Sequence, residues 1–431
     1  MRNVIIKKFF FLVFLFTLQA SFSLELVDIH TTLQNVFSNI VGSNEGSTGF
    51  PVLSIPFGGR CESFGTAYSA LSQDVSFFDY NPAGSANLEN KELALFHNSW
   101  IADSALETIA FSSRKGDLGY GAALKVFYVP FTEYNIFGES VSNGYYSESV
   151  AYGNIAYTFL SGYDFKGITV GANLKAVFRS VPDYTDSATD EIIPDSGLSQ
   201  SAFGLMTDVG MQMQFNFLKA YSSREANCRF SFVVQDLGVS LTGFSQSLVF
   251  DDALPTKIVA GFSYKPIRPL LFAIEFRQPV NLKDFSATEQ WEAGFGFGVN
   301  FTDFFTLQMG SLFIGGYPRF SLGASIFVRG LWFDINYSLD ITSSLNPLNR
   351  ISLAAKFNLG DEGRKEQARY VDELYKQGLQ FYTLGYMKEA ITTWETLLKI
   401  NPRFDPAKRG IEAAKKAQVL LDQIIEIQKL D

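Results

Sequence analysis

Apolar and polar residues alternate with a period of two through most of the chain between Glu92 and Asn358. In one such run, Trp291, Ala293, Phe295, Phe297, Val299 and Phe301 alternate with Glu292, Gly294, Gly296, Gly298 and Asn300. This period places apolar side chains on one face of a β-strand and small or polar ones on the other. Strands of soluble proteins average about five or six residues, whereas a tilted membrane-spanning strand needs about 9 to 11. Because the runs are long, they favour an all-β transmembrane barrel over a soluble exported β-sandwich.

We expect about fourteen antiparallel strands, an even number as in single-chain bacterial barrels. Their expected first residues are Leu93, Leu106, Gly119, Ser147, Gly167, Ser201, Arg229, Lys257, Leu270, Trp291, Phe305, Arg319, Leu331 and Arg350. Residues 130–146, 179–200 and 236–256 are expected to form long polar loops, and 264–266 and 328–330 tight turns. The barrel is expected to occupy residues 91–359. Charged residues make up only 18% of the chain, which suits strands that face lipid.

The first 23 residues have the pattern of a secretory signal peptide. Arg2, Lys7 and Lys8 precede a mostly apolar run at 9–18, and small residues stand at Ser21 and Ser23. An uncleaved anchor is the alternative, but the run is short for a membrane span. No later stretch of about 18 apolar residues follows, which argues against a helical membrane protein.

Residues 24–90 precede the first expected strand and are expected to form an N-terminal hatch, or plug, inside the barrel. A barrel of about fourteen strands is too wide to be filled by its own side chains, so its lumen needs an occupant. Within this segment, residues 24–41 carry apolar residues at helical spacing.

The strand pattern ends at a polar linker, residues 360–364, and residues 365–431 are charged and helical in pattern. The residues Leu374, Gly378, Phe381, Gly385, Ala390, Trp394 and Pro402 stand at the spacing of a tetratricopeptide repeat, which this span resembles. Gln377 departs from the repeat pattern, since the repeat often has leucine there. Residues 406–429 are expected to form a capping helix.

A docking surface is the functional interpretation of this helical unit, which we expect in the periplasm. Its expected concave face presents Asp372, Tyr375, Leu379 and Tyr382 to a partner protein. The alternative is that the helices only brace or plug the barrel, because a single repeat falls below the three or so needed for independent stability.

Residues 58–84 read GGRCESFGTAYSALSQDVSFFDYNPAG. This segment resembles the N-terminal region of the long-chain fatty-acid outer-membrane transporter (FadL-like) family. The matching residues are Gly65, Ala67, Ala70, Asp74, Asn81, Pro82, Ala83 and Gly84, and the Asn-Pro-Ala-Gly element is the most specific of them. The appended helical unit departs from that family.

The resemblance implies a fourteen-stranded outer-membrane barrel with a hatch, uptake of hydrophobic molecules such as long-chain fatty acids, and lateral release. The candidate ligand-lining residues are Phe64, Tyr68, Phe77, Phe78 and Tyr80. The alternative for these five is that they pack the hatch against the barrel wall. For Asn81, Pro82, Ala83 and Gly84 we favour a structural turn that places the hatch.

Several functions are not expected. The net charge of −9 argues against nucleic-acid binding. No nucleophile elbow or phosphate-binding loop occurs, and the two histidines, His30 and His97, have no metal-ligand spacing, so we expect no enzyme, cofactor or metal. Whether Cys61 and Cys228 pair is left open by the sequence.

Three functions remain. The first is a transporter for long-chain fatty acids or similar molecules in the bacterial outer membrane, in contact with its lipid. The second is an outer-membrane scaffold that docks periplasmic or secreted proteins through the helical unit. The third is a general porin. A transporter requires an apolar path at the hatch, and a porin requires an open polar lumen.

Overall fold

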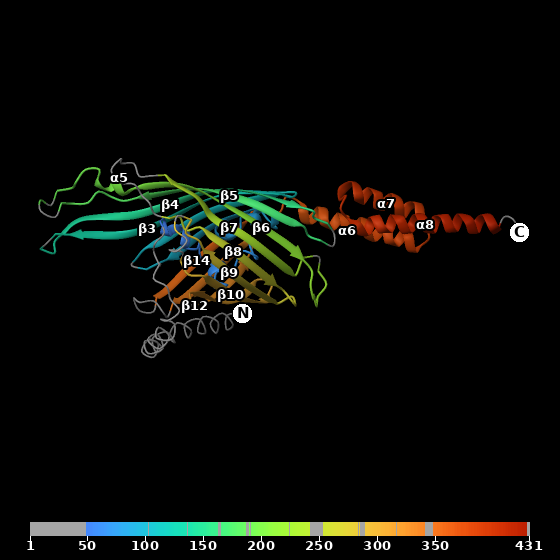
Figure 1. Ribbon diagram of the computed structural model, residues 1–431. Helices are drawn as coiled ribbons and strands as arrows, with labels where there is room; N and C mark the ends of the chain where they lie inside the picture. The colour runs from blue at the N-terminus through green and yellow to red at the C-terminus, as the bar shows by residue number, and fades with distance from the viewer. Residues whose placement is uncertain are drawn as a thin grey trace.

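The structure is a computed structural model that describes residues 49–428 with short gaps (Figure 1). The gaps fall at 102, 136, 163–164, 187–188, 190, 224, 242–252, 283, 285–288, 316 and 341–347. The expected signal peptide and the expected helix at 24–41 lie outside the described residues.

Fourteen strands form one closed barrel in which each strand is antiparallel to its neighbours, and β1 pairs with β14 to close the ring. The strands are β1 (Glu92–Ser99), β2 (Ala105–Lys115), β3 (Leu118–Tyr134), β4 (Ser140–Phe159), β5 (Ile168–Ser180), β6 (Ala202–Phe215), β7 (Cys228–Leu241), β8 (Lys257–Tyr264), β9 (Leu270–Pro279), β10 (Glu292–Thr302), β11 (Phe305–Ile314), β12 (Tyr317–Val328), β13 (Leu331–Asp340) and β14 (Leu348–Asn358). The expected fold class is confirmed. Every strand except β4 begins within two residues of its expected start.

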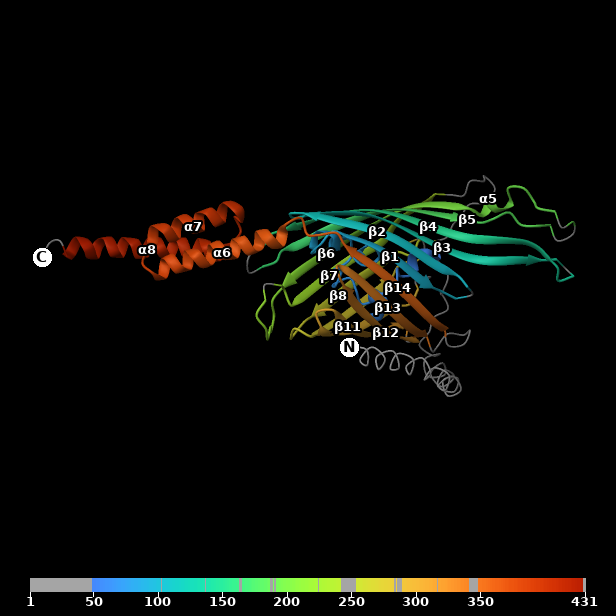
Figure 2. The same cartoon turned by 180° about the vertical axis from the view of Figure 1, so that it is seen from behind.

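The β3–β4 hairpin corrects the expected loop at 130–146. Its strands stay paired beyond Tyr128, with Pro130 opposite Tyr145 and Thr132 opposite Asn143. The turn is confined to 135–139, where the Asn135 side chain accepts hydrogen bonds from the backbone N–H groups of Phe137 and Glu139. Aromatic residues on both strands favour pairing, so the polar composition of this segment was a poor guide. The hairpin projects beyond the rest of the barrel (Figures 1 and 2).

The loop predicted at 236–256 is also shorter than expected, because strand β7 extends to Leu241. The connection at 181–201 carries a short helix, α5 (Ser196–Gln200), and an isolated bridge between Thr185 and Ile192. The long connections lie at one end of the barrel, which we call the long-loop end. The two tight turns expected near 265 and 329 lie at the other end, the short-turn end, because antiparallel strands alternate in direction.

The two faces of the wall are inverted relative to a soluble protein. Large apolar side chains face outward, such as Ile155 and Leu174, which are 59% and 64% exposed. Polar and charged side chains on the alternate positions are buried in the lumen, such as Asn173, Lys175 and Gln212. An apolar exterior around a polar interior is the construction of a membrane-spanning barrel.

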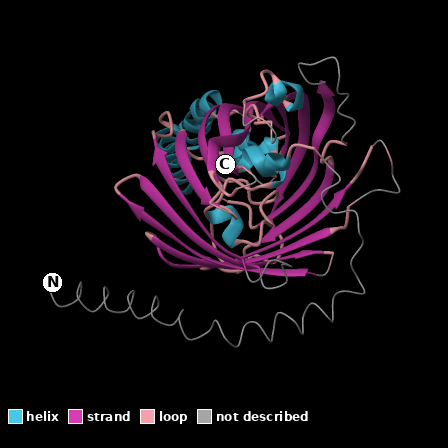
Figure 3. Cartoon of the chain, turned by 90° about the vertical axis from the view of Figure 1, so that its left-hand side faces the viewer, coloured by secondary structure: helices cyan, strands magenta, loops and turns pink. Residues whose placement is uncertain are grey.

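The chain before β1 runs through the lumen as a plug, here residues 50–88 (Figure 3). Its short helical pieces are η2 (Pro51–Ser54), α3 (Arg60–Ser63), α4 (Phe77–Tyr80) and η3 (Pro82–Asn87). Gly49 donates a backbone hydrogen bond to Ala253 at the long-loop end, and Lys91 donates one to Gly360 at the short-turn end. The plug therefore crosses the barrel from one end to the other.

Three helices follow β14 and project from the short-turn end (Figures 1 and 2). They are α6 (Arg364–Thr383), α7 (Met387–Ile400) and α8 (Asp405–Gln428). They pack on a core of their own that includes Leu374, Trp394 and Phe404. Within the described part of the chain, no helix has both the length and the hydropathy that a membrane crossing requires.

Candidate functional site: the plug and its cavities

One side of the plug is held against glycines of the barrel wall. Phe64 is fully buried and lies over Gly296 and Gly298 of β10, and a Cβ atom at Gly310 of β11 would collide with the backbone of Gly65. The plug approaches β10 so closely that its alternating inward-facing positions have room only for glycine. Tyr68 is also fully buried and donates a hydrogen bond from its hydroxyl to Asp74 over 2.8 Å.

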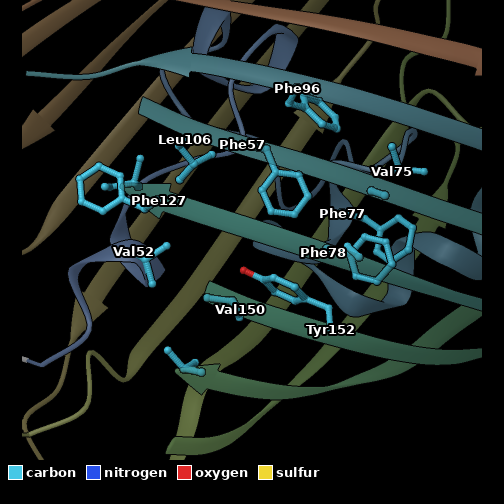
Figure 4. Close-up of a cluster of buried hydrophobic side chains, with 14 of the residues drawn as sticks. Val52, Phe57, Val75, Phe77, Phe78, Phe96, Leu106, Phe127, Val150 and Tyr152 are labelled. Atoms are coloured by element: carbon cyan, nitrogen blue, oxygen red, sulfur yellow. The ribbon is translucent and has the colours of Figure 1, made fainter. Parts of the chain in front are cut away.

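The opposite side of the plug packs on β1–β5 through an aromatic cluster (Figure 4). The rings of Phe77 and Phe78 are stacked with centroids 4.3 Å apart, and Phe78 meets Tyr152 of β4 edge-on. Phe57 contacts both Tyr152 and Phe96. Phe77 and Phe78 are both fully buried, so in this structure they contribute to packing.

The Asn-Pro-Ala-Gly element ties two parts of the plug to the wall. The Asn81 side chain accepts a hydrogen bond from Ala83 N–H, which caps η3, and donates to the carbonyls of Ser69 and Met211. The carbonyl of Pro82 accepts a hydrogen bond from Asn154 of β4. These contacts agree with the structural turn that we favoured for residues 81–84.

Buried ion pairs fasten the plug on two sides. Asp79 lies 3.1 Å from the Nζ atom of Lys125 on β3 and also accepts a hydrogen bond from Tyr152. Asp74 forms an ion pair with Lys356 of β14, which also contacts Asp334 of β13. Because these charges are almost completely buried, each needs its partner, and the pairs specify where the plug sits.

A cavity of about 540 Å³, which we call the upper cavity, lies between the plug and the wall toward the long-loop end. Its apolar lining includes Leu53, Trp100, Phe127, Val129, Leu312 and Ile314. Its charged lining includes Lys257, Arg277, Glu292 and Arg319. Of the five candidate ligand-lining residues, only Tyr80 borders this cavity, where the guanidinium of Arg277 lies 5.5 Å from its ring centroid. Phe64, Tyr68, Phe77 and Phe78 lie within the packed plug.

Arg350 of β14 lies beside the upper cavity and is only 3% exposed. Its guanidinium carbon is 3.9 Å from the ring centroid of Trp100, which borders the cavity. Its Nη2 atom is buried and has no hydrogen-bond partner among the described residues. A buried donor without an acceptor is costly, and Trp100 connects this arginine to the lining of the cavity.

A second cavity of about 360 Å³, the lower cavity, lies on the other side of the plug. Its lining is mainly polar and includes Gln73, Asp74, Gln212, Arg229 and Lys356. The plug thus separates a partly apolar cavity from a polar one.

The helical unit uses two of its four candidate docking residues internally. Tyr375 and Tyr382 both lie beside the indole of Trp394, with ring centroids 6.3 and 6.1 Å away. Gly378 leaves room for that indole, because a Cβ atom there would overlap it. Leu379 is 40% exposed, and Asp372 is partly exposed.

The linker fixes the helical unit to the short-turn end of the barrel. Lys91 forms a 2.6 Å salt bridge with Glu362, and this hydrogen bond lowers the pKa of the Glu362 carboxyl below its usual range. Arg403, between α7 and α8, lies 2.8 Å from Asp117 in the β2–β3 turn. The two cysteines, Cys61 and Cys228, are both free and buried.

Sequence reasoning missed Lys125, Arg277, Arg350 and Lys356. Each is a charged residue on the polar phase of an alternating strand, and that phase is the signal that could have identified them as luminal. The plug partners of Lys125, Arg277 and Lys356 could not be read from the strands, since the contacts join residues far apart in the chain.

Some solved structures share the barrel at low sequence identity. The toluene transporter TbuX of Ralstonia pickettii is 12% identical with a TM-score of 0.42, covering 70% of this chain and 98% of that one. The toluene transporter TodX of P. putida is 11% identical with a TM-score of 0.43, covering 66% and 94%.

Sequence relatives are much more similar. A "UPF0164 protein" of Treponema pallidum (strain Nichols) is 32% identical over 385 residues, which cover 87% of this chain and 84% of the relative. A second protein of that description, from the same organism, is 28% identical over 387 residues, covering 88% and 77%. The family described as "Uncharacterised protein family (UPF0164)" matches residues 32–362. The chain therefore belongs to the UPF0164 family.

Proposed function

We propose that this protein is an outer-membrane transporter that takes up long-chain fatty acids or similar hydrophobic molecules with an acidic group. The observation that carries the proposal is the upper cavity, whose apolar lining includes Trp100. The buried guanidinium of Arg350 lies against the ring of Trp100, and its Nη2 atom has no acceptor among the described residues. The resemblance of residues 58–84 to the long-chain fatty-acid transporter family points the same way.

The chemistry of the cavity suits an amphiphile. An acyl chain would lie against Leu53, Trp100 and Phe127, which removes apolar surface from water at about 25 cal/mol per Å². Its carboxylate would accept a hydrogen bond from Arg350, since a charge-assisted bond to a guanidinium is stronger than a neutral one. A neutral hydrocarbon would leave the Arg350 donor without an acceptor.

The plug makes transport depend on rearrangement. Its aromatic cluster and ion pairs fill the lumen between the two cavities, which argues against the open polar lumen of a general porin. A ligand in the upper cavity would have to shift part of the plug or leave through the wall.

The orientation follows from barrel construction. Outer-membrane barrels have short turns on the periplasmic side and longer loops outside. The upper cavity would then open to the cell exterior, and α6–α8 would lie in the periplasm. We expect no enzymatic activity.

A scaffold is the second candidate function, favoured by the exposed apolar side chains of α8. Val419, Leu420 and Ile424 are 57%, 59% and 50% exposed on a helix that extends past α6 and α7. With the partly exposed Leu379, they give the tetratricopeptide-like unit a surface for a periplasmic or secreted protein.

Native mass spectrometry of the full chain in mild detergent tests the transporter proposal. The wild type is loaded with oleate and compared with Arg350→Gln and with the matched control Arg329→Gln, a change in the β12–β13 turn. Oleate retained by the wild type and the control but lost from Arg350→Gln supports fatty-acid binding in the upper cavity. Equal retention by all three contradicts it. No acyl ligand on any of them, with a periplasmic protein retained instead, favours the scaffold.

A further inference from the structure

A crevice of about 640 Å³ lies where the helical unit meets the short-turn end of the barrel. Its walls come from the β2–β3 turn, the β4–β5 connection, the first turns of α6 and the α7–α8 connection. Among the described residues, the crevice is lined by three arginines, Arg114, Arg364 and Arg403, together with Lys166 and the carboxylate of Asp117. Three guanidinium groups gathered at one concave surface give it a positive charge.

The Asp117 carboxylate forms a direct ion pair with one of these arginines. Asp117 accepts from the Nη1 atom of Arg403, which also donates to Ser161. The Nε atom of Arg114 donates over 2.7 Å to the carbonyl of Gly116. A carbonyl satisfies a donor but does not neutralise a charge.

Arg364 is likewise held by carbonyl groups, those of Asp361, Leu88 and Glu89. The nearby carboxylate of Glu362 is paired with Lys91. Another carboxylate in this region, Asp405 at the start of α8, lies 3.2 Å from Lys408. The positive charge of the crevice is therefore only partly compensated by the described residues around it.

We propose that this crevice binds a phosphate group, from a phospholipid headgroup or from free phosphate. Guanidinium groups match the geometry of phosphate oxygens and donate charge-assisted hydrogen bonds to them. A concave surface lined by one sign of charge concentrates the field that attracts such an anion. The first turns of α6 contribute Arg364, Gln367 and Ala368 to the same space, while the N-terminus of the helix is capped by the Asp361 carboxylate, which accepts hydrogen bonds from the N–H groups of Gly363 and Lys365. This site is separate from the upper cavity and does not rest on the transport proposal.

Titration calorimetry on the full chain in phosphate-free maltoside micelles tests the site. The two probes are inorganic phosphate and dihexanoyl phosphatidylglycerol. Arg114→Gln should weaken binding roughly tenfold, since a hydrogen bond to a charged group is worth about 1.5 to 3 kcal/mol. It leaves the Arg403–Asp117 contact in place. Asp117→Asn should tighten binding, because it removes a carboxylate that lines the crevice.

The matched control is Arg369→Gln, which removes the same charge from an exposed position of α6 outside the crevice lining. Weakening of both probes by Arg114→Gln alone supports a general phosphate site, and weakening of the lipid alone assigns the headgroup. Unchanged binding of both probes in Arg114→Gln, or an equal loss in Arg369→Gln, overturns the proposal.

Discussion

Lys125 of β3 lies with its Nζ atom 3.1 Å from Oδ2 of Asp79 in the plug, and both side chains are almost completely buried. The pair joins the barrel wall to the plug at one point, close to the aromatic cluster. Asp79 also accepts hydrogen bonds from the N–H group of Phe57, near the start of the plug, and from the hydroxyl of Tyr152 in the barrel wall. This carboxylate therefore links two parts of the plug to the wall.

Lys125→Met should loosen the plug. The change leaves the Asp79 carboxylate buried without its cation, which costs roughly 3 to 5 kcal/mol, toward the lower end because two donors remain. In a planar bilayer the variant should show more frequent and larger ion-conducting openings than the wild type. The double variant Lys125→Met with Asp79→Asn should recover part of the closure, and an equally leaky double variant would mean that the pair is not the cause.

A side chain at Gly310 should push the plug from its place. Gly310→Ala puts a Cβ atom into the backbone of Gly65, and backbone cannot rotate away as a side chain can. We expect raised conductance and a lower urea midpoint. Gly153→Ala is the matched control, since its Cβ atom would meet nothing within 4 Å. Similar behaviour of the two variants would contradict the close plug–wall contact.

Trp394→Ala should unfold the helical unit while the barrel stays intact. The indole is 1% exposed and fills the space between α6 and α7, so its removal should cost about 3 to 5 kcal/mol. Circular dichroism at 222 nm during heating should show an early helical transition in the full chain. Tyr386→Ala, at a position 56% exposed, should melt like the wild type. An unchanged helical transition in Trp394→Ala would count against the packing described.

The linker should loosen in acid. The hydrogen bond from Lys91 lowers the pKa of Glu362 from its ordinary value of 4.5, so the contact stabilises the linker fully above that value. The stabilisation is lost as the pH falls through the lower folded-state pKa. Hydrogen exchange at residues 360–364 should therefore increase in that acidic range. Glu362→Gln should abolish this pH dependence, and a variant that still shows it would assign the effect to another group.

Most of the barrel could be predicted because alternation is a local signal. Strands such as β8 and β11 begin at the expected residue, since lipid on one side and a polar lumen on the other impose a strict period of two. The start of β4 at Ser140 was missed. Its first residues include Asn143 and Gly144, which have low strand propensity, and they are held in the sheet by pairing with β3.

The cavity could not be predicted, because it is assembled by closure of the barrel. Trp100 and Arg277, which line the cavity, lie far apart in sequence, and Arg350 reaches Trp100 only when β1 pairs with β14. The aromatic residues near Phe78 were visible in the sequence, but whether they pack or bind depends on how closely the wall approaches them. In this structure Phe64 lies against the glycines of β10, and Phe78 lies against Tyr152 of β4.

The path of the plug from one end of the barrel to the other has a topological consequence. Residue 49 is tied to the long-loop end and residue 91 to the short-turn end, so the chain is threaded through a closed ring. To leave toward the short turns, the plug would have to draw residue 49 through the lumen behind it. In the other direction it would have to pull out β1. A path that opens while residue 49 stays at the long-loop end must therefore open inside an occupied ring, with the plug still joined covalently to β1 at the seam with β14.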